Sequence, residues 1–144
     1  MDSESVAFLI EKEAVVRVLS QYARGIDRKD ADLYRSCLAD PIDVDAGEFG
    51  GVGMKADDWL AEAFEIADGY TSTQHIITNH EVEFPDGPGG NEAHCRAYLQ
   101  AQHWRAEESM LLGGRYDHRL RKEAGTWRIY KMELKVDWFQ KERP

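Results

Sequence analysis

The chain has 144 residues, of which 42% are apolar and 31% are charged, and this balance is ordinary for one globular domain. Its formal net charge of −9 argues against nucleic acid and anionic membrane surfaces as partners, because both require basic patches. Its N-terminus lacks the pattern of a signal peptide, and no stretch approaches the ~18 apolar residues of a membrane span. We therefore expect residues 1–144 to form a single soluble domain that works in the cytoplasm.

The two cysteines, Cys37 and Cys95, favour the same compartment. They are too few for a disulfide framework, and their spacing differs from that of a zinc site. We interpret both as buried thiols in a reducing environment.

Apolar residues recur at helical spacing through the first half of the chain. The predicted helices cover residues 5–28, 31–38 and 57–67. Pro41 follows the second helix and stops it. At the start of the third helix, Asp57 or Asp58 is a candidate cap for the free backbone N–H groups.

The second half of the chain has the turn signals and alternation of strands. The predicted strands cover residues 73–84, 92–105, 110–122 and 126–138. Short links between consecutive strands favour antiparallel pairing. Helices followed by such a sheet predict an α+β fold, with N-terminal helices packed on an antiparallel sheet.

The strand 92–105 alternates between two kinds of side chain, as a half-buried strand does. One face carries small or apolar residues and a histidine, namely Ala93, Cys95, Ala97, Leu99, Ala101 and His103. Small side chains on an inward face leave space. The pattern leaves open whether a ligand or closely packed helices fill that space.

Two residues are candidates for chemistry. Asp27 lies on one flank of the first helix with Leu19 and Ala23, at the edge of its apolar face, where a carboxylate is costly unless it is paired. Alternatively, it points to solvent beside the neighbouring arginines. His75 opens the strand 73–84, and histidine is the usual general base near neutral pH. Alternatively, it is a strand histidine whose nitrogens bond to backbone or water.

Four segments around these candidates resemble a known family. They are Tyr22-Ala23-Arg24-Gly25-Ile26-Asp27-Arg28-Lys29-Asp30, Ser72-Thr73-Gln74-His75-Ile76-Ile77-Thr78-Asn79, Gly114-Arg115-Tyr116-Asp117 and Gly125-Thr126-Trp127-Arg128-Ile129. With them the chain resembles SnoaL-like members of the nuclear transport factor 2-like superfamily. It is similar to the branch that contains scytalone dehydratase, bile-acid 7α-dehydratase and hexachlorocyclohexane dehydrochlorinase. The resemblance implies a cone-shaped α+β barrel, in which helices wrap a strongly bent sheet around a pocket for small, often apolar molecules.

The resemblance also implies roles for individual residues. In these relatives an Asp–His dyad abstracts a proton without a metal or a cofactor, which makes His75 the base here and Asp27 its orienting partner. Tyr22 matches a pocket tyrosine whose phenol polarises a carbonyl or leaving oxygen. His103 roughly matches a second pocket histidine, which assists departure of a hydroxyl as a general acid. Tyr116 is expected to face inward beside them.

One position departs from the family pattern. The dehydrochlorinase and the bile-acid enzyme place an arginine on the last strand, and Met132 stands at that position here. The cation that assists the leaving group is therefore missing or comes from another residue, which disfavours the dehydrohalogenase interpretation. Together with Trp59, Phe64 and Leu99, Met132 predicts an apolar ligand.

Three hypotheses for the function remain. The first is a cofactor-independent lyase of the dehydratase type that acts on a small apolar cyclic substrate through the Asp27–His75 dyad. The second is an isomerase or cyclase of the ketosteroid isomerase or polyketide cyclase type, with Asp45 as a carboxylate base, although Asp45 also fits an exposed residue at a strand end. The third is a non-catalytic protein that binds a small molecule.

A metal site built from His75, His103 and Asp27 has suitable ligand types. We rank it below the dyad, because the alternation places His80 and His94 on the opposite faces of their strands and no HxH or HExxH pattern exists. We therefore expect no metal and no cofactor. The resemblance further implies oligomers that form through the outer sheet face, where residues Arg96, Tyr98 and Trp104 suit a homodimer or homotrimer.

Overall fold

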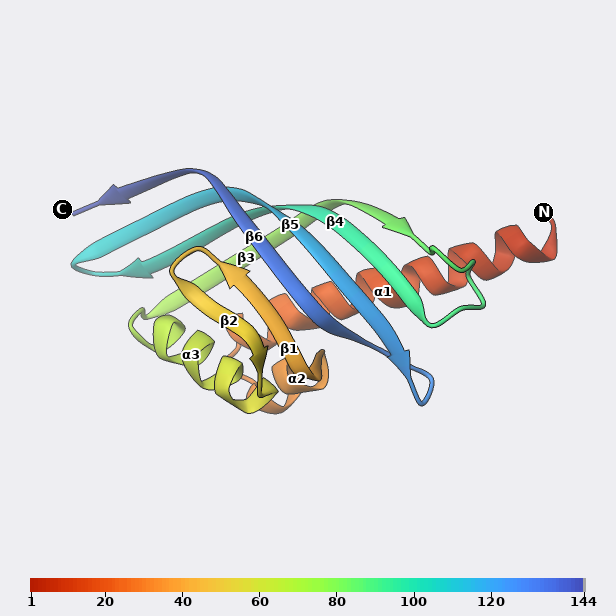
Figure 1. Cartoon of the computed structure of the whole chain (residues 1–144). Helices are drawn as coiled ribbons and strands as arrows, with labels where there is room; N and C mark the ends of the chain where they lie inside the picture. Colours follow the sequence, from red (N-terminus) through yellow and green to blue (C-terminus); the bar gives the residue numbers. More distant parts are fainter. Residues whose placement is uncertain (144) are drawn as a thin grey trace.

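Six strands form one curved sheet, and three helices cover one side of it in the computed structural model, which describes residues 1–143 (Figure 1). The order of strands across the sheet is β2-β1-β6-β5-β4-β3. The α+β fold with N-terminal helices is confirmed. The elements are α1 (Ser3–Asp27), α2 (Ala31–Ser36), β1 (Leu38–Ala46), β2 (Phe49–Met54), α3 (Ala56–Asp68), β3 (Ser72–Glu83), β4 (Glu92–Arg105), β5 (Glu108–Glu123) and β6 (Thr126–Glu142).

The four predicted strands form the long part of the sheet, and each pairs antiparallel with the next in the chain. β4 has the predicted bounds, and its residues alternate between buried and exposed from end to end. The predicted inward face, which runs from Ala93 to His103, is the buried one. The outer face exposes large side chains, including Tyr98 and Trp104.

The sheet is mixed and open, whereas we expected a strongly curved antiparallel sheet in a cone-shaped barrel. The sequence did not predict β1 and β2, and β1 pairs parallel with β6 while β2 forms an edge. The segment has the turn residues of a loop, including Pro41 and three glycines in β2. Gly50 has a φ of 100°, and a Cβ there would lie 2.4 Å from the Val44 carbonyl oxygen. Glycine is thus needed for this tight edge hairpin.

A bulge in β3 reverses the alternation that the sequence suggests. The register with β4 shifts between Thr78 and Glu81, where Asn79 and His80 both lie opposite Ala97. Asn79 has a φ of 56°, a conformation that asparagine tolerates better than most residues. Because of the extra residue, His80 turns to the inner side, where it is half-buried near α1. The prediction that His80 lies on the opposite face from His75 was therefore wrong.

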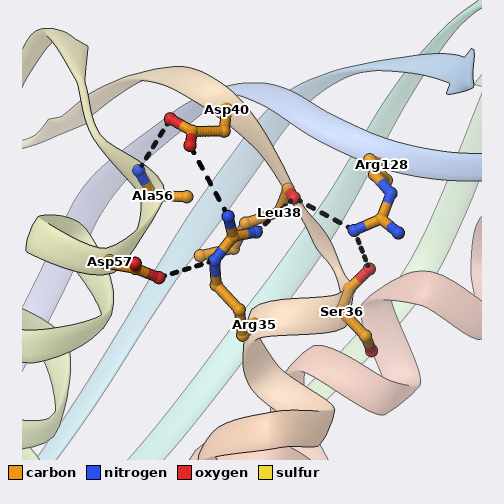
Figure 2. A network of polar contacts seen from close by, with 7 residues as sticks. All are labelled: Arg35, Ser36, Leu38, Asp40, Ala56, Asp57 and Arg128. Carbon is orange, nitrogen blue, oxygen red and sulfur yellow. Dashed lines mark hydrogen bonds and ion pairs between the residues drawn. The ribbon is translucent and has the colours of Figure 1, made fainter.

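One arginine joins α2, β1 and α3 (Figure 2). Arg35 donates to the Asp57 carboxylate at 2.8 Å and to the Leu38 carbonyl at 3.1 Å. Asp40 accepts from the Ala56 backbone N–H at 3.2 Å and so satisfies a free donor at the start of α3. The prediction that an aspartate of α3 itself caps this helix was wrong, because Asp57 is turned toward Arg35 instead.

The buried side chains form one continuous cluster between the helices and the sheet. α1 contributes a face that includes Val15, Leu19 and Tyr22, which agrees with its predicted periodicity. Within the described residues, no helix is both long enough and apolar enough to cross a membrane.

Gly25 lets α1 approach α2 closely, and this contact is testable. A Cβ at residue 25 would lie 2.7 Å from the backbone nitrogen of Tyr34 and 2.9 Å from its Cα. We expect Gly25→Ala to lower the free energy of unfolding by about 1–3 kcal/mol, because the backbone of α2 must shift. This loss would outweigh the gain of up to about 1 kcal/mol that alanine brings to a helix.

Urea unfolding measures the difference. Gly89→Ala is the matched control, because a Cβ there meets nothing within 4 Å, and we expect a change within about 0.5 kcal/mol. Equal stability of the two variants would show that α1 and α2 are less closely packed than the structure indicates.

Candidate functional site

The carboxylate of Asp27 and the ring of His75 meet at the edge of the sheet. Asp27 is the last residue of α1, and its Oδ1 lies 2.7 Å from His75 Nδ1. The same carboxylate accepts the His75 backbone N–H at 2.8 Å and the Thr73 hydroxyl at 3.0 Å. The two side chains are only 13% and 15% exposed, so the contact is largely protected from water.

These contacts determine which ring nitrogen of His75 carries the proton. Burial opposes ionisation of Asp27, but hydrogen bonds from the His75 ring and backbone and from Thr73 outweigh it and lower the pKa of this carboxyl. An ionised carboxylate only accepts hydrogen bonds, so the proton of a neutral His75 must lie on Nδ1. Nε2 then carries the lone pair, and among the described residues it has no hydrogen-bond partner.

His75 borders a partly open cavity of about 210 Å³ between the sheet and the helices. The wall is mostly apolar. The cavity-lining residues are Tyr22, Ile26, Tyr34, Ala46, Phe49, Trp59, Ala63, Ile66, Ala67, His75, Leu99, Ala101, His103, Met110, Leu112, Tyr116, Met132, Leu134 and Val136. On its other side, His75 borders an open groove between α1 and β3, which Asp27 also lines.

Most residues that the sequence singled out for binding do line this cavity, and Phe64 is the exception. Tyr22, Trp59, Leu99, His103, Tyr116 and Met132 all belong to the wall. Phe64 packs edge-on against Tyr34 with ring centroids 5.4 Å apart, behind the wall. The helical repeat explains the difference, because Trp59, Ala63 and Ile66 share one stripe of α3 and Phe64 lies about 100° away from Ala63.

His103 lies beside His75, with ring centroids 5.6 Å apart. Burial and the charge of His75 lower the pKa of His103 to about 4. His103 is therefore neutral near pH 7, and its Nδ1 has no partner among the described residues. A neutral imidazole fits a hydrogen-bonding role in the wall better than the cationic acid role that the resemblance implies.

Tyr22 and Met132 meet across the cavity wall. The Tyr22 hydroxyl donates to the Met132 sulfur at 3.4 Å, which is a weak acceptor. Burial raises the pKa of Tyr22 well above its ordinary value, so the phenol keeps its proton. Tyr22 can therefore turn its donor toward a bound molecule at little cost.

The other candidates lie away from the cavity. Asp45 is exposed on β1 and lines no part of the cavity, so the structure does not bring it to the site. His94 is half-buried and pairs with Glu92 at 3.7 Å. Residues 1–143 contain no group of three or more His, Cys, Asp or Glu side chains placed to hold a metal ion.

Three residues near the site escaped the sequence analysis. Thr73 is the third donor to Asp27. It lies two residues before His75, so strand alternation places both side chains on the same face, and this contact could have been predicted. Tyr34 belongs to the predicted helix 31–38 and was not singled out, yet it lines the cavity. His118 is fully buried next to Tyr116, with ring centroids 4.4 Å apart, and nothing in its alternating strand distinguished it.

Comparisons with known proteins agree with this architecture. The family model for the SnoaL-like domain matches residues 7–133. The chain belongs to the SnoaL-like domain family. No curated protein matches the sequence significantly.

Solved structures share the fold of this SnoaL-like chain at low sequence identity. A proposed scytalone dehydratase from Novosphingobium aromaticivorans has a TM-score of 0.84 and 22% identity, with 94% of this chain and 90% of that chain covered. The Kfla4162 protein from Kribbella flavida has a TM-score of 0.82 and 23% identity, with 91% and 93% covered. The hexachlorocyclohexane dehydrochlorinase LinA-type3 from Novosphingobium barchaimii has a TM-score of 0.80 and 15% identity, with 96% and 94% covered.

The buried His118 predicts a pH dependence of stability. Burial lowers its pKa to about 3, and neither ring nitrogen has a partner among the described residues. The unfolded chain binds a proton here below about pH 6.5 and the folded chain does not, so the free energy of unfolding falls as pH decreases from about 6.5 toward 3. The contribution of one such histidine is about 1.4 kcal/mol per pH unit.

We expect His118→Leu to reduce this slope by about 1.4 kcal/mol per pH unit between roughly pH 6 and pH 4, with His103 still contributing. Urea unfolding at a series of pH values measures the slope. An unchanged slope in His118→Leu would mean that His118 is protonated or solvated in the folded state.

Proposed function

We propose that the chain is a cofactor-independent lyase of the dehydratase type that acts on a small apolar cyclic substrate. The observation that carries this proposal is the 2.7 Å contact between Asp27 and His75 at the wall of a mostly apolar cavity. The contact leaves the lone pair of His75 Nε2 available to act as a base toward a bound molecule. The names of two structural neighbours, a dehydratase and a dehydrochlorinase, both describe eliminations and so support this class.

The geometry supports one balanced sequence of steps. Nε2 of His75 takes a proton from a substrate carbon, and the electron pair of that C–H bond forms the new double bond. The bond from the adjacent carbon to its hydroxyl breaks, and the imidazolium returns the proton to the departing hydroxyl, which leaves as water. Asp27 keeps Nδ1 as a donor throughout and stabilises the imidazolium while it exists.

The alternatives use the same cavity in different ways. An isomerase or cyclase would also begin with proton abstraction, and the exposed position of Asp45 favours His75 as the base for that reaction too. A protein that only binds a ligand needs no oriented base. The three donors that fix the Asp27 carboxylate beside His75 therefore favour catalysis over binding alone.

The role of His75 is testable without the natural substrate. We expect the protein to catalyse deuterium exchange of acidic C–H groups in a panel of small cyclic ketones and β-hydroxy ketones, followed by NMR in D₂O. His75→Gln should slow the exchange roughly 100- to 10,000-fold, because it removes the general base. Asp45→Asn is the control and should leave the rate unchanged. Exchange that survives in His75→Gln but fails in Asp45→Asn would favour the carboxylate-base hypothesis.

Asp27→Asn tests the positioning role separately. Both carboxylate oxygens accept hydrogen bonds. Oδ1 accepts from the His75 ring and the Thr73 hydroxyl, and Oδ2 accepts from the His75 backbone N–H. An asparagine amide must therefore place its NH₂ group against one of these donors. We expect a loss of roughly 100-fold or more in kcat, as the ring loses its orientation and its tautomer. Thr73→Val keeps the carboxylate and should cost much less. Equal losses in the two variants would point to a structural effect.

We also propose that the chain forms a homodimer or homotrimer through the outer sheet face and works in the cytoplasm. Ile76, Tyr98 and Trp104 are 48%, 57% and 47% exposed on that face, and exposed apolar side chains that lie together mark interaction surfaces. Light scattering after gel filtration should give a dimer or trimer mass, and Trp104→Glu should lower it. The unpaired buried thiols of Cys37 and Cys95 support the reducing compartment.

A further inference from the structure

The open groove on the other side of His75 has no role in the mechanism described above. α1 packs against β3, the strand at the edge of the sheet (Figure 1), and the groove between them has a volume of about 710 Å³. α1 contributes Arg24, Asp27 and Arg28 to it, and β3 contributes residues 72–77. Among the described residues, His75 alone lines both this groove and the cavity. The groove is therefore the second space that a molecule bound at His75 can reach.

Arg24 and Arg28 are the cations of the groove. They lie four residues apart, so they project from the same face of α1, and both are exposed. Within residues 1–143 neither side chain forms an ion pair, whereas the adjacent Lys29 pairs with Asp68 at 3.4 Å. Most other arginines do pair with a carboxylate, namely Arg35, Arg96, Arg105, Arg115, Arg121 and Arg143. The two guanidinium groups are thus available to an anion from outside the chain.

The helix alone does not account for the two arginines at this place. Like charges four residues apart repel each other and weaken a helix. The helix dipole favours positive charge near the end of α1 and offsets part of this repulsion. However, Arg17 lies on the same helix face, seven residues before Arg24, and does not line the groove. The feature that sets Arg24 and Arg28 apart is their position beside the groove and near His75.

The carboxylate of Asp27 also lines the groove, but it is already satisfied. Its oxygens accept from the His75 ring and backbone and from the Thr73 hydroxyl. Around the helix axis, Asp27 lies about 60° from Arg24 and about 100° from Arg28, so its side chain points toward β3 and theirs point toward the rim. Two cations and one engaged carboxylate give the groove a net positive charge, although the whole chain has a net charge of −9.

The chemistry of the two arginines identifies the kind of ligand group. A guanidinium is a planar fork of five N–H donors that matches the paired oxygens of a carboxylate or a phosphate. On the opposite side of the groove, Ser72 and Gln74 add exposed neutral donors. The groove therefore suits one carboxylate or phosphate group held by both guanidiniums.

The size of the cavity explains why a substrate would need the groove. The cavity has a volume of about 210 Å³. A cavity of about 150 Å³ in another protein is large enough for benzene, so the space here takes one small ring system and little more. Any longer substituent must extend out of the cavity, and the groove beside His75 offers more than three times the volume.

We propose that Arg24 and Arg28 bind the anionic end of the substrate, a carboxylate or a phosphate, in the groove between α1 and β3. The substrate is then amphipathic, with an apolar ring in the cavity and an anionic chain outside it. The assignment of the anion to the substrate rests on the proposed function, whereas the binding of an anion by the two arginines does not.

Inorganic phosphate and acetate are the probes for the anion site itself. Each is titrated into the ¹⁵N-labelled protein at constant ionic strength, kept with sodium chloride, and followed by ¹H–¹⁵N NMR. We expect saturable shifts of backbone amides at the end of α1 and in residues 72–77, with a dissociation constant of roughly 1–10 mM, as two charge-assisted contacts imply. Saturation by only one of the two probes would assign the group as a phosphate or as a carboxylate. Shifts that saturate with neither probe would overturn the site.

A matched set of variants separates the site from general attraction. We expect Arg24→Gln and Arg28→Gln each to weaken binding of the probe roughly five- to tenfold, because each removes one charge-assisted contact. Arg17→Gln is the control, because it removes the same charge from the same exposed helix face outside the groove, and it should change the affinity less than about twofold. Equal losses in all three variants, or no loss in Arg24→Gln and Arg28→Gln, would overturn the assignment.

Matched ketones test whether the anion belongs to the substrate. 2-Oxocyclohexyl alkanoates of increasing chain length and their methyl esters share a ring, a ketone and a chain, and they differ in charge. The protons next to the ketone exchange in D₂O when a base removes them. At the best chain length we expect the carboxylate to exchange about tenfold faster than its ester at concentrations below saturation. This preference should vanish in Arg24→Gln and Arg28→Gln and persist in Arg17→Gln.

The two experiments distinguish failure of this inference from failure of the proposed function. Binding of phosphate or acetate that depends on Arg24 and Arg28, without His75-dependent exchange of any ketone, would support the anion site and contradict the lyase. Exchange that depends on His75 but shows no preference for the carboxylate at any chain length would support the base and overturn the anionic substrate. If the arginines still bind phosphate or acetate in that case, the anion is a separate ligand.

Discussion

The carboxylate of Asp27 is the interaction on which the site depends. β3 lies at the edge of the sheet, and its outward backbone N–H groups have no neighbouring strand to pair with. Asp27 takes up one of them, at His75, and adds the Thr73 hydroxyl and the His75 ring. The carboxylate lies at the C-terminal end of α1, where the helix dipole disfavours a negative charge, so these donors must more than compensate. One group thus attaches the first helix to the sheet and orients the proposed base.

Among the described residues, some buried polar atoms without a hydrogen-bond partner line the cavity, and others, at His80, Arg105 and His118, do not. Tyr34, Trp59 and His103 line the cavity, so a bound molecule is able to satisfy them. His118 is fully buried behind Tyr116 and does not line the cavity, so no ligand relieves it. Each such group costs about 1–3 kcal/mol of stability. The cost at His118 has no functional explanation in the structure, whereas a bound molecule would recover the cost in the cavity wall.

The sequence predicted the parts of the fold whose patterns are local. The alternation in β4 and the helical periodicity of α1 depend on burial against one neighbour, and both were read correctly. β1 and β2 were missed because their glycines and Pro41 are typical of loops, and only pairing with β6 makes the segment a strand. The prediction of the strand face on which His80 lies was wrong, because the bulge at Asn79 adds one residue to the strand and strict alternation does not predict such a bulge.

The sequence alone identified Asp27 and His75 as candidates, because carboxylates and histidines are the residue types that move protons. The meeting of Asp27 and His75 followed only from the family resemblance, because helical position by itself left Asp27 free to face solvent. The place of Tyr34 in the cavity wall was not predictable. It depends on how Arg35 and Asp57 bring two helices together, and neither residue lies in the cavity wall.

The position of Met132 separates two kinds of elimination that this architecture can perform. A halide leaves as an anion, and an enzyme that expels it gains from a cation at the place where the charge appears. A hydroxyl instead needs a proton, which the imidazolium formed at His75 can return to it. The resemblance places an arginine of the dehydrochlorinase at this position, and here a neutral sulfur accepts the Tyr22 hydroxyl at 3.4 Å. Under the proposed function, a methionine in place of the arginine therefore favours departure of water over departure of halide.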